Sequence, residues 1–138
     1  MNEPIRLDPD GPALPADSTL DREEYLEMHT AVGDPHRFRI MRVLNQAAEQ
    51  GARLSAIQLA DAVELPSNKL HYHLDKLVRV GLVRREKAPT RDDEGYSSYY
   101  TPSAMGRKIL SHGIEELMRR EWEFSRRYAE PSPAENTE

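Results

Sequence analysis

The sequence predicts a mainly α-helical fold with one small β-hairpin. Three observations lead to this prediction. Two short amphipathic helices meet at a tight turn within residues 54–83, two strand-like runs bracket a polar loop between residues 82 and 101, and a long amphipathic stretch covers residues 103–128. A chain of 138 residues is long enough for one domain with a small core.

The formal net charge of the chain is −5, but the acidic groups are concentrated at its two ends. Residues 1–33 carry two basic and eight acidic side chains, residues 34–128 carry 17 and 13, and residues 129–138 carry none and three. The acidic, proline-rich residues 1–19 and the polar residues 129–138 are expected to be disordered tails. The folded domain is therefore expected to span residues 20–128.

The chain contains no cysteine, which excludes disulfides and thiolate metal sites. It has no apolar run long enough to cross a membrane, and its first residues, MNEPIRLDPDGP, include no hydrophobic signal region. We therefore expect a cytoplasmic protein without a membrane partner. No serine elbow, glycine-rich phosphate loop or complete set of metal ligands is present, so we expect neither catalysis nor a cofactor.

Two helices are predicted before the central segment. The first covers residues 21–32, and Thr19 or Asp21 can cap its start. Its apolar face, formed by Tyr25, Met28 and Val32, needs a partner surface. The second begins at Asp34-Pro35, where the carboxylate can cap a first turn that tolerates proline, and it ends near residue 49.

Residues 54–83 predict two short helices joined by a tight turn. Pro66 disfavours a helical conformation at Leu65, and either Pro66 or Ser67 can open the second helix. Gly81 predicts where that helix ends. Apolar residues line one face of each helix, namely Leu59, Ala60 and Val63 before the turn and Leu70, Leu74 and Leu77 after it. This pattern is typical of a helix-turn-helix.

The opposite face of the second helix carries polar side chains that suit a DNA major groove. Asparagine can pair with adenine, lysine can reach guanine or phosphate, and tyrosine can donate to phosphate. Residues 66–91 hold seven basic and two acidic side chains, a local charge of +5. The candidate DNA-binding residues here are Ser67, Asn68, Lys69, His71, Tyr72 and Lys76. The alternative interpretation is a solvated helix face.

Residues 82–87 and 96–101 predict two strands that form a hairpin, or wing, around a polar loop. Its candidate DNA-binding residues are Arg84, Arg85, Lys87 and Arg91, which could straddle a phosphate backbone. The acidic residues 92–94 at the tip argue against deep insertion into a groove. Ordinary outward-pointing polar residues of a strand are the alternative interpretation.

Residues 103–128 predict one long helix with a seam like that of a coiled coil, in which Glu121 takes an apolar position. A small core cannot cover so much apolar surface, so we expect a homodimer. The candidate interface residues of this helix are Leu110, Ile114, Leu117, Met118, Glu121, Trp122, Phe124 and Tyr128. Tyr25, Met28 and Val32 of the first helix are expected to complete the interface.

Two phrases of the sequence resemble the ArsR-type winged helix-turn-helix regulators. Residues 31–44, AVGDPHRFRIMRVL, are similar to that family's Leu-Gly-Asp-Pro-x-Arg-x-x-Ile-Leu phrase. Residues 70–83, LHYHLDKLVRVGLV, are similar to its recognition helix, usually Val-Ser-x-His-Leu-x-x-Leu-x-x-x-Gly-Leu-Val. Residues 101–107 instead resemble the Leu-Thr-x-x-Gly-Arg phrase of MarR-type proteins. The resemblance covers about residues 32–101.

The resemblance implies a winged helix-turn-helix fold with dimerisation helices at both ends. It also implies a homodimeric transcriptional regulator, a repressor, that binds specific double-stranded DNA sequences. A winged helix used for protein contacts is the alternative function. His71 stands where the family usually has serine, and His73 matches a family histidine for which a structural role and a DNA contact are both open.

Many members of the resembled family sense metals. His112 and Glu115 match only half of the family's site on the last helix, and stable zinc sites need about three or four protein ligands, so no metal is expected. A small-molecule effector is compatible with the pattern. Neither such an effector nor the operator and target genes can be identified from the sequence.

Overall fold

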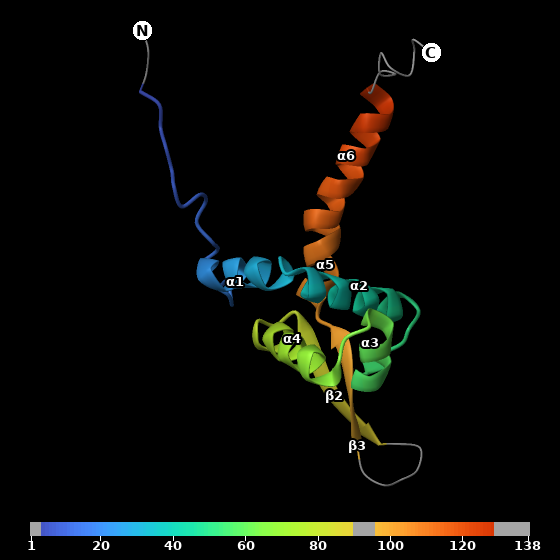
Figure 1. Ribbon diagram of the computed structural model, residues 1–138. Coiled ribbons are helices and arrows are strands. Elements are labelled where there is room, and N and C mark those ends of the chain that lie inside the picture. The colour runs from blue at the N-terminus through green and yellow to red at the C-terminus, as the bar shows by residue number, and fades with distance from the viewer. Residues whose placement is uncertain (1–3, 90–95, 129–138) are drawn as a thin grey trace, which may run out of the picture.

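The computed structural model of the protein describes residues 4–89 and 96–128. A compact helical body carries a hairpin at one end and a projecting helix at the other (Figure 1). The elements in chain order are α1 (Arg22–Val32), α2 (Pro35–Glu49), β1 (Leu54–Ser55), α3 (Ala56–Val63), α4 (Ser67–Arg79), β2 (Val83–Pro89), β3 (Tyr96–Pro102), α5 (Ala104–Ile109), the π-helical turn η1 (Leu110–Ile114) and α6 (Glu115–Tyr128). The fold is mainly helical with a small sheet, as the sequence predicts.

Helices α1 and α2 begin where side chains cap their first turns. The Asp21 carboxylate accepts a hydrogen bond from the backbone N–H of Glu24, and the Glu24 side chain accepts one in return from the backbone of Asp21. Asp21, and not Thr19, is therefore the cap of α1. The Asp34 carboxylate accepts from the backbone N–H groups of His36 and Arg37, which confirms the predicted start of α2.

Helices α3 and α4 form the predicted helix-turn-helix. Ser55 caps α3 together with Gln58, and Glu64 ends it in the left-handed conformation. Pro66 occupies the cap position of α4 and Ser67 is its first helical residue, so the fixed φ of proline, and no side-chain cap, opens this helix. Gly81, with φ of +86°, follows the end of α4 as predicted.

The sheet has three antiparallel strands in the order β1-β3-β2. β2 and β3 form the predicted hairpin, in which Val83 lies opposite Pro102 and Arg85 lies opposite Tyr100. β1, formed by Leu54 and Ser55, pairs with β3 and corrects the expectation that helix-forming residues begin at Leu54. Two residues are too few to show the alternation by which a strand is identified in a sequence.

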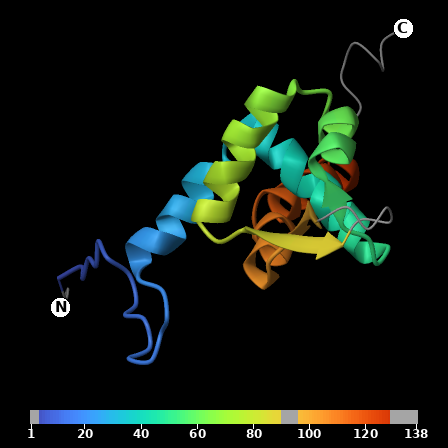
Figure 2. The same ribbon diagram turned by 90° about the horizontal axis from the view of Figure 1, so that it is seen from below.

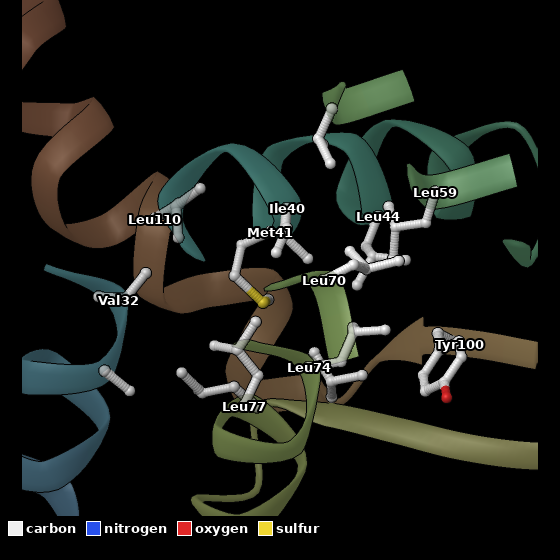
Figure 3. Packing of buried hydrophobic residues seen from close by; sticks show 14 of the residues in the cluster. Val32, Ile40, Met41, Leu44, Leu59, Leu70, Leu74, Leu77, Tyr100 and Leu110 are labelled. Carbon is white, nitrogen blue, oxygen red and sulfur yellow. The ribbon is translucent and has the colours of Figure 1, made fainter. Parts of the chain in front are cut away.

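The core lies where α1, α2, α3, α4 and η1 meet the sheet. Figure 3 shows its labelled side chains converging from these helices and from Tyr100 of β3. Each of the predicted apolar faces of α2, α3 and α4 contributes buried residues. The most completely buried side chains are Ile40, Met41, Leu44, Leu59, Val63, Leu70, Leu74, Leu77, Leu82 and Leu110. Their mutual contacts exclude water from the centre of the domain.

Helix α5 approaches the start of β2 so closely that only glycine fits at the contact. A Cβ atom added to Gly106 would lie 2.1 Å from the carbonyl oxygen of Leu82 and 2.9 Å from the terminal methyl of Met41. The Ser103 hydroxyl caps α5 and also donates to the carbonyl of Gly81. Residues 103–106 therefore fasten the last helices to the end of the helix-turn-helix.

The last helical segment is not continuous, which corrects the prediction of a single helix over residues 103–128. Gly113 has the non-helical angles φ −119° and ψ −109°, and the turn around it is π-helical. Glycine tolerates such angles because it has no Cβ, and a π-helical turn inside a helix changes its direction. α5 consequently packs in the body while α6 projects from it (Figure 1).

Candidate nucleic-acid interface

The outward face of α4 presents the polar side chains that the sequence predicts for it. Ser67, Asn68, Lys69, His71 and Tyr72 are all exposed, and only Lys76 is half-buried. The ammonium of Lys76 lies over the ring of Tyr72, 5.0 Å from the ring centre. Figure 2, which views the molecule from below, shows α4 in yellow-green across this side with the hairpin beside it. A convex helix with exposed hydrogen-bonding groups has the shape and chemistry to enter a major groove.

His73 is turned inward, which decides between the two roles left open by the sequence. It is 8% exposed, and Arg37 Nη1 lies 3.1 Å from its Nδ1. Burial lowers the pKa of His73 and the nearby charge of Arg37 adds to this, although Asp34, 3.9 Å away, acts in the opposite direction. His73 is therefore a buried residue of the body and is not on the outward face.

Arg85 of the hairpin is held against α4. Its Nη2 lies 2.9 Å from the Asp75 carboxylate, and its guanidinium lies over the Tyr100 ring at 5.6 Å. The contacts with Tyr100 and Asp75 raise the pKa of Arg85. This arrangement explains the one anion on α4, because Asp75 joins the helix to the hairpin. The cation of Arg85 is thereby partly neutralised, which makes it a weaker candidate for a phosphate contact than the sequence suggests.

The remaining basic residues of β2 divide between its two faces. Side chains alternate along a strand, so Lys87 lies on the same face of β2 as Arg85, whereas Arg84 and Glu86 lie on the other face. Arg84 Nη2 is 3.6 Å from the Glu86 carboxylate. Lys87 thus shares the strand face from which Arg85 contacts α4, and Arg84 does not. Arg91 lies outside the residues that the structure describes.

Arg53 is a basic residue of this region that sequence reasoning missed. Its Nη1 lies 3.6 Å from the Glu86 carboxylate, and its guanidinium lies over the Tyr99 ring at 4.9 Å. It joins Arg84 on the outer face of the sheet. Its only signal in the sequence is a positive charge just before β1, and the pairing with a residue 33 positions later cannot be found from local periodicity.

α6 presents the opposite chemistry from α4. Several of its charged residues pair with one another: Arg119 contacts both Glu116 and Glu123, and Arg120 contacts Glu116. Glu115, at the start of α6, pairs instead with Arg42 of α2. The hydrogen bonds from Arg119 and Arg120 lower the pKa of Glu116 to about 2. The large apolar side chains of α6 are exposed, namely Leu117, Met118, Trp122 and Phe124. Ile114 in η1 is exposed as well. Part of the Trp122 ring is covered by the guanidinium of Arg126, at 4.7 Å.

An apolar hollow of about 440 Å³ continues the exposed stripe of α6 onto the body. It lies between the α1–α2 junction and the turn at Gly113, and its lining includes Val32, Phe38, Leu117 and Met118. Ile109 and Ile114 complete its apolar wall. The hollow and the stripe form one surface, on which water meets apolar groups from both the body and α6.

Three of the predicted interface residues belong instead to the core of the same chain. Met28, Val32 and Leu110 are 4%, 9% and 1% exposed, and Tyr25 packs partly against them. The bend at Gly113 turns Leu110 into the body, and α1 uses its apolar face to cover α2 and α4. These apolar side chains are therefore buried within a single chain. Glu121, another predicted interface residue, is exposed on α6. The side chain of Tyr128 lies outside the described part of the chain.

Residues 4–89 and 96–128 contain neither a group of metal ligands nor a helix that could cross a membrane. Within these ranges, no three His, Cys, Asp or Glu side chains are grouped closely enough to hold a metal ion. The helices in the same ranges are too short or too polar for any of them to cross a bilayer.

Known proteins similar to this chain include a winged helix-turn-helix domain. Residues 32–86 match the family described as a helix-turn-helix domain. The homodimeric winged helix-turn-helix DNA-binding domain of Mb0332 from Mycobacterium bovis, a possible ArsR-family transcriptional regulator, is 17% identical with a TM-score of 0.59, over 73% of this chain and 83% of that one. HlyU from Vibrio cholerae is 26% identical with a TM-score of 0.52, over 71% and 91%. NolR from Sinorhizobium fredii is 25% identical with a TM-score of 0.54, over 69% and 84%.

No curated protein is significantly similar in sequence to this chain. The matched residues 32–86 run from the end of α1 to the middle of β2, and so include the turn between α3 and α4. The structural matches cover a larger share of the chain than residues 32–86 do. The chain therefore contains a helix-turn-helix domain, and its fold is the winged helix-turn-helix.

Proposed function

We propose that the protein is a transcriptional regulator that binds specific double-stranded DNA sequences through the outward face of α4. The observation that supports this most directly is that Asn68, Lys69, His71 and Tyr72 are all exposed on one helix whose other face is fixed in the core. A rigid helix keeps its base-contacting groups in position when the groove approaches. Lys87, on the face of β2 from which Arg85 contacts α4, adds a group for a phosphate contact.

A selection experiment with random duplex DNA tests this proposal. The full chain should enrich one sequence motif from a random library, because exposed asparagine and lysine side chains distinguish base pairs. Binding to unselected duplexes should be weaker and should fall steeply as salt rises, with a slope of about −0.9 for each phosphate contacted. Failure to retain any duplex at low salt would overturn the proposal and leave the winged helix as a module for protein contacts.

We further propose that the protein acts as a homodimer, a cytoplasmic repressor of the ArsR type. The exposed stripe of α6 and the adjoining hollow support an apolar partner, and a second copy of the chain supplies a matching stripe. Each large apolar side chain gains roughly 1.5–3 kcal/mol when it is fully buried. Two α4 helices related by a two-fold axis would read half-sites about 34–36 Å apart, and a dimer on a promoter would block access to it.

Sedimentation of a double variant tests the dimer. Leu117→Asp with Met118→Asp places two charges in the stripe and should give monomers at concentrations where the unaltered chain is a dimer, because buried unpaired carboxylates are strongly unfavourable. Glu123→Ala on the opposite side of α6 is the matched control and should remain dimeric. A double variant that sediments as a dimer would place the interface elsewhere.

A further inference from the structure

Arg37 connects the end of α1 to the buried side of α4. Its Nε donates a hydrogen bond to the carbonyl of Ala31 at 2.6 Å, and its Nη1 lies 3.1 Å from Nδ1 of His73. Its backbone N–H is also bound by the Asp34 carboxylate. Among the described residues, His73 is the one buried polar or charged side chain. The two phrases of the sequence that resemble a known family therefore meet in space, through Arg37 and His73.

The contact with Arg37 determines the protonation state of His73. A guanidinium can only donate hydrogen bonds, so Nδ1 of His73 must accept and the imidazole must be neutral, with its proton on Nε2. If Nδ1 carried a proton, its N–H and the N–H of Arg37 Nη1 would both be donors, 3.1 Å apart, with no acceptor between them. Burial and the charge of Arg37 both disfavour the imidazolium and lower the pKa of His73.

The other charged groups around His73 do not change this conclusion. Asp34, at the start of α2, favours the imidazolium, whereas His36 of α2 and Lys76 of α4 disfavour it. Glu27 of α1 and Arg79 of α4 line a hollow together with Arg37 and Lys76. On the hairpin side, Asp75 is paired with Arg85. The net result is a lowered pKa, so the neutral form that Arg37 requires is favoured at neutral pH.

We propose that Arg37 is a positioning residue for DNA binding: its bond to neutral His73 fixes α4 against the α1–α2 junction, and protonation of His73 releases the helix and weakens binding. This inference rests on the proposed function of α4. His73 directly follows Tyr72 in sequence, and the two rings are in edge contact at 5.2 Å, so displacement of His73 moves a side chain of the outward face.

Protonation of His73 breaks the bond from Arg37, which weakens binding. His71 is exposed on the outward face of the same helix, so it belongs to the surface that would meet DNA. The effect of His73 is therefore measured in a chain that carries His71→Asn.

His73→Asn is the decisive variant. An asparagine carboxamide oxygen can accept the hydrogen bond of Arg37 from near the position of Nδ1, and it does not titrate. At pH 7.5 this variant should bind the selected duplex within about threefold of the unaltered chain, and Arg37→Lys should bind about tenfold more weakly, because lysine cannot donate to both His73 and the Ala31 carbonyl from one planar group.

The test is DNA affinity from pH 8 to pH 5 for the unaltered chain, His71→Asn and the double variant His71→Asn with His73→Asn. We expect affinity to fall with acidification in His71→Asn and to stay level in the double variant. The same fall in both would overturn the inference while leaving DNA binding intact, whereas no binding by the unaltered chain at any pH would overturn the proposed function itself.

An NMR titration of the His73 imidazole provides a readout that needs no DNA. Arg37→Gln removes the nearby charge, so the pKa of His73 should rise in this variant toward its ordinary value. A dispersed amide spectrum shows that the variant is folded. An unchanged titration in a folded Arg37→Gln variant would show that Arg37 does not control the protonation of His73, and would overturn the inference.

Discussion

α4 and α6 have similar apolar stripes in the sequence and opposite surroundings in the structure. In α4 the residues Leu70, Leu74 and Leu77 are fully buried by the same chain, which leaves the polar face outside. In α6 several charged residues pair with one another, and Leu117 and Trp122 are 63% and 58% exposed. α4 therefore presents groups for a polar partner and α6 presents groups for an apolar one, which fits DNA at one end of the domain and a second chain at the other.

Removing one leucine from each helix should give the largest difference between the two regions. Leu74→Ala should lower the free energy of unfolding by about 2–5 kcal/mol, because it leaves a cavity in the core. Leu117→Ala should change the stability of an isolated chain by no more than about 0.5 kcal/mol. Urea denaturation at two protein concentrations measures both values.

The protein concentration distinguishes the two effects. The loss caused by Leu117→Ala should grow as the concentration rises, since dimer formation contributes to stability by mass action, whereas the loss caused by Leu74→Ala should not. Equal losses for both variants at every concentration would mean that α6 packs against the body of its own chain.

The periodicity of the sequence could predict the stripes but not their partners. The spacing of Leu70, Leu74 and Leu77 identifies a buried face correctly, because α4 lies between elements that cover it. Leu110 has the same spacing with Leu117 but lies before the bend at Gly113, which places it in the core. A glycine inside a periodic helix allows a bend without requiring one. The direction of α6 depends on packing around residues 103–113, and the pattern contains no information about that.

The outward face of α4 could also be predicted from the periodicity of the sequence. The side-chain contacts that hold α4 and the hairpin in place could not. Exposure follows from position on the helix once the buried side is known. The pairing of Asp75 with Arg85, of Arg53 with Glu86 and of Arg37 with His73 depends on the arrangement of distant segments. The sequence therefore predicts Arg85 as a DNA contact without its pairing to Asp75, and the phrase that includes Arg37 does not indicate that Arg37 contacts His73 of α4.

The two faces of β2 offer a smaller test of which surface meets DNA. Lys87→Ala should weaken binding to all duplexes and reduce the salt slope by about 0.9, because Lys87 lies on the face of β2 from which Arg85 contacts α4 and would contact phosphate. Arg84→Ala, on the other face of the strand, is the matched control and should leave the slope unchanged. The reverse result would place the DNA against the outer face of the sheet, with Arg53 and Arg84.

The smallest expected effect is the pH dependence of stability. The pKa of His73 is lowered in the folded state, so below its ordinary value of about 6.5 the unfolded chain binds more protons than the folded one. The free energy of unfolding should therefore decrease as pH falls through that value, and level off below the folded pKa. Urea denaturation of His73→Asn should lack this contribution. An identical pH profile in the variant would mean that His73 is not the titrating group.

The central claim, that the outward face of α4 reads DNA bases, is tested most directly by comparing affinities for the selected duplex and for random duplex. Asn68→Ala and Tyr72→Ala should each weaken binding to the selected duplex by about 1–3 kcal/mol while leaving binding to random duplex nearly unchanged, because base contacts contribute only at the cognate site. Glu123→Ala on α6 should bind both duplexes as the unaltered chain does. Equal losses on both duplexes in the α4 variants, or no loss on either, would contradict the claim.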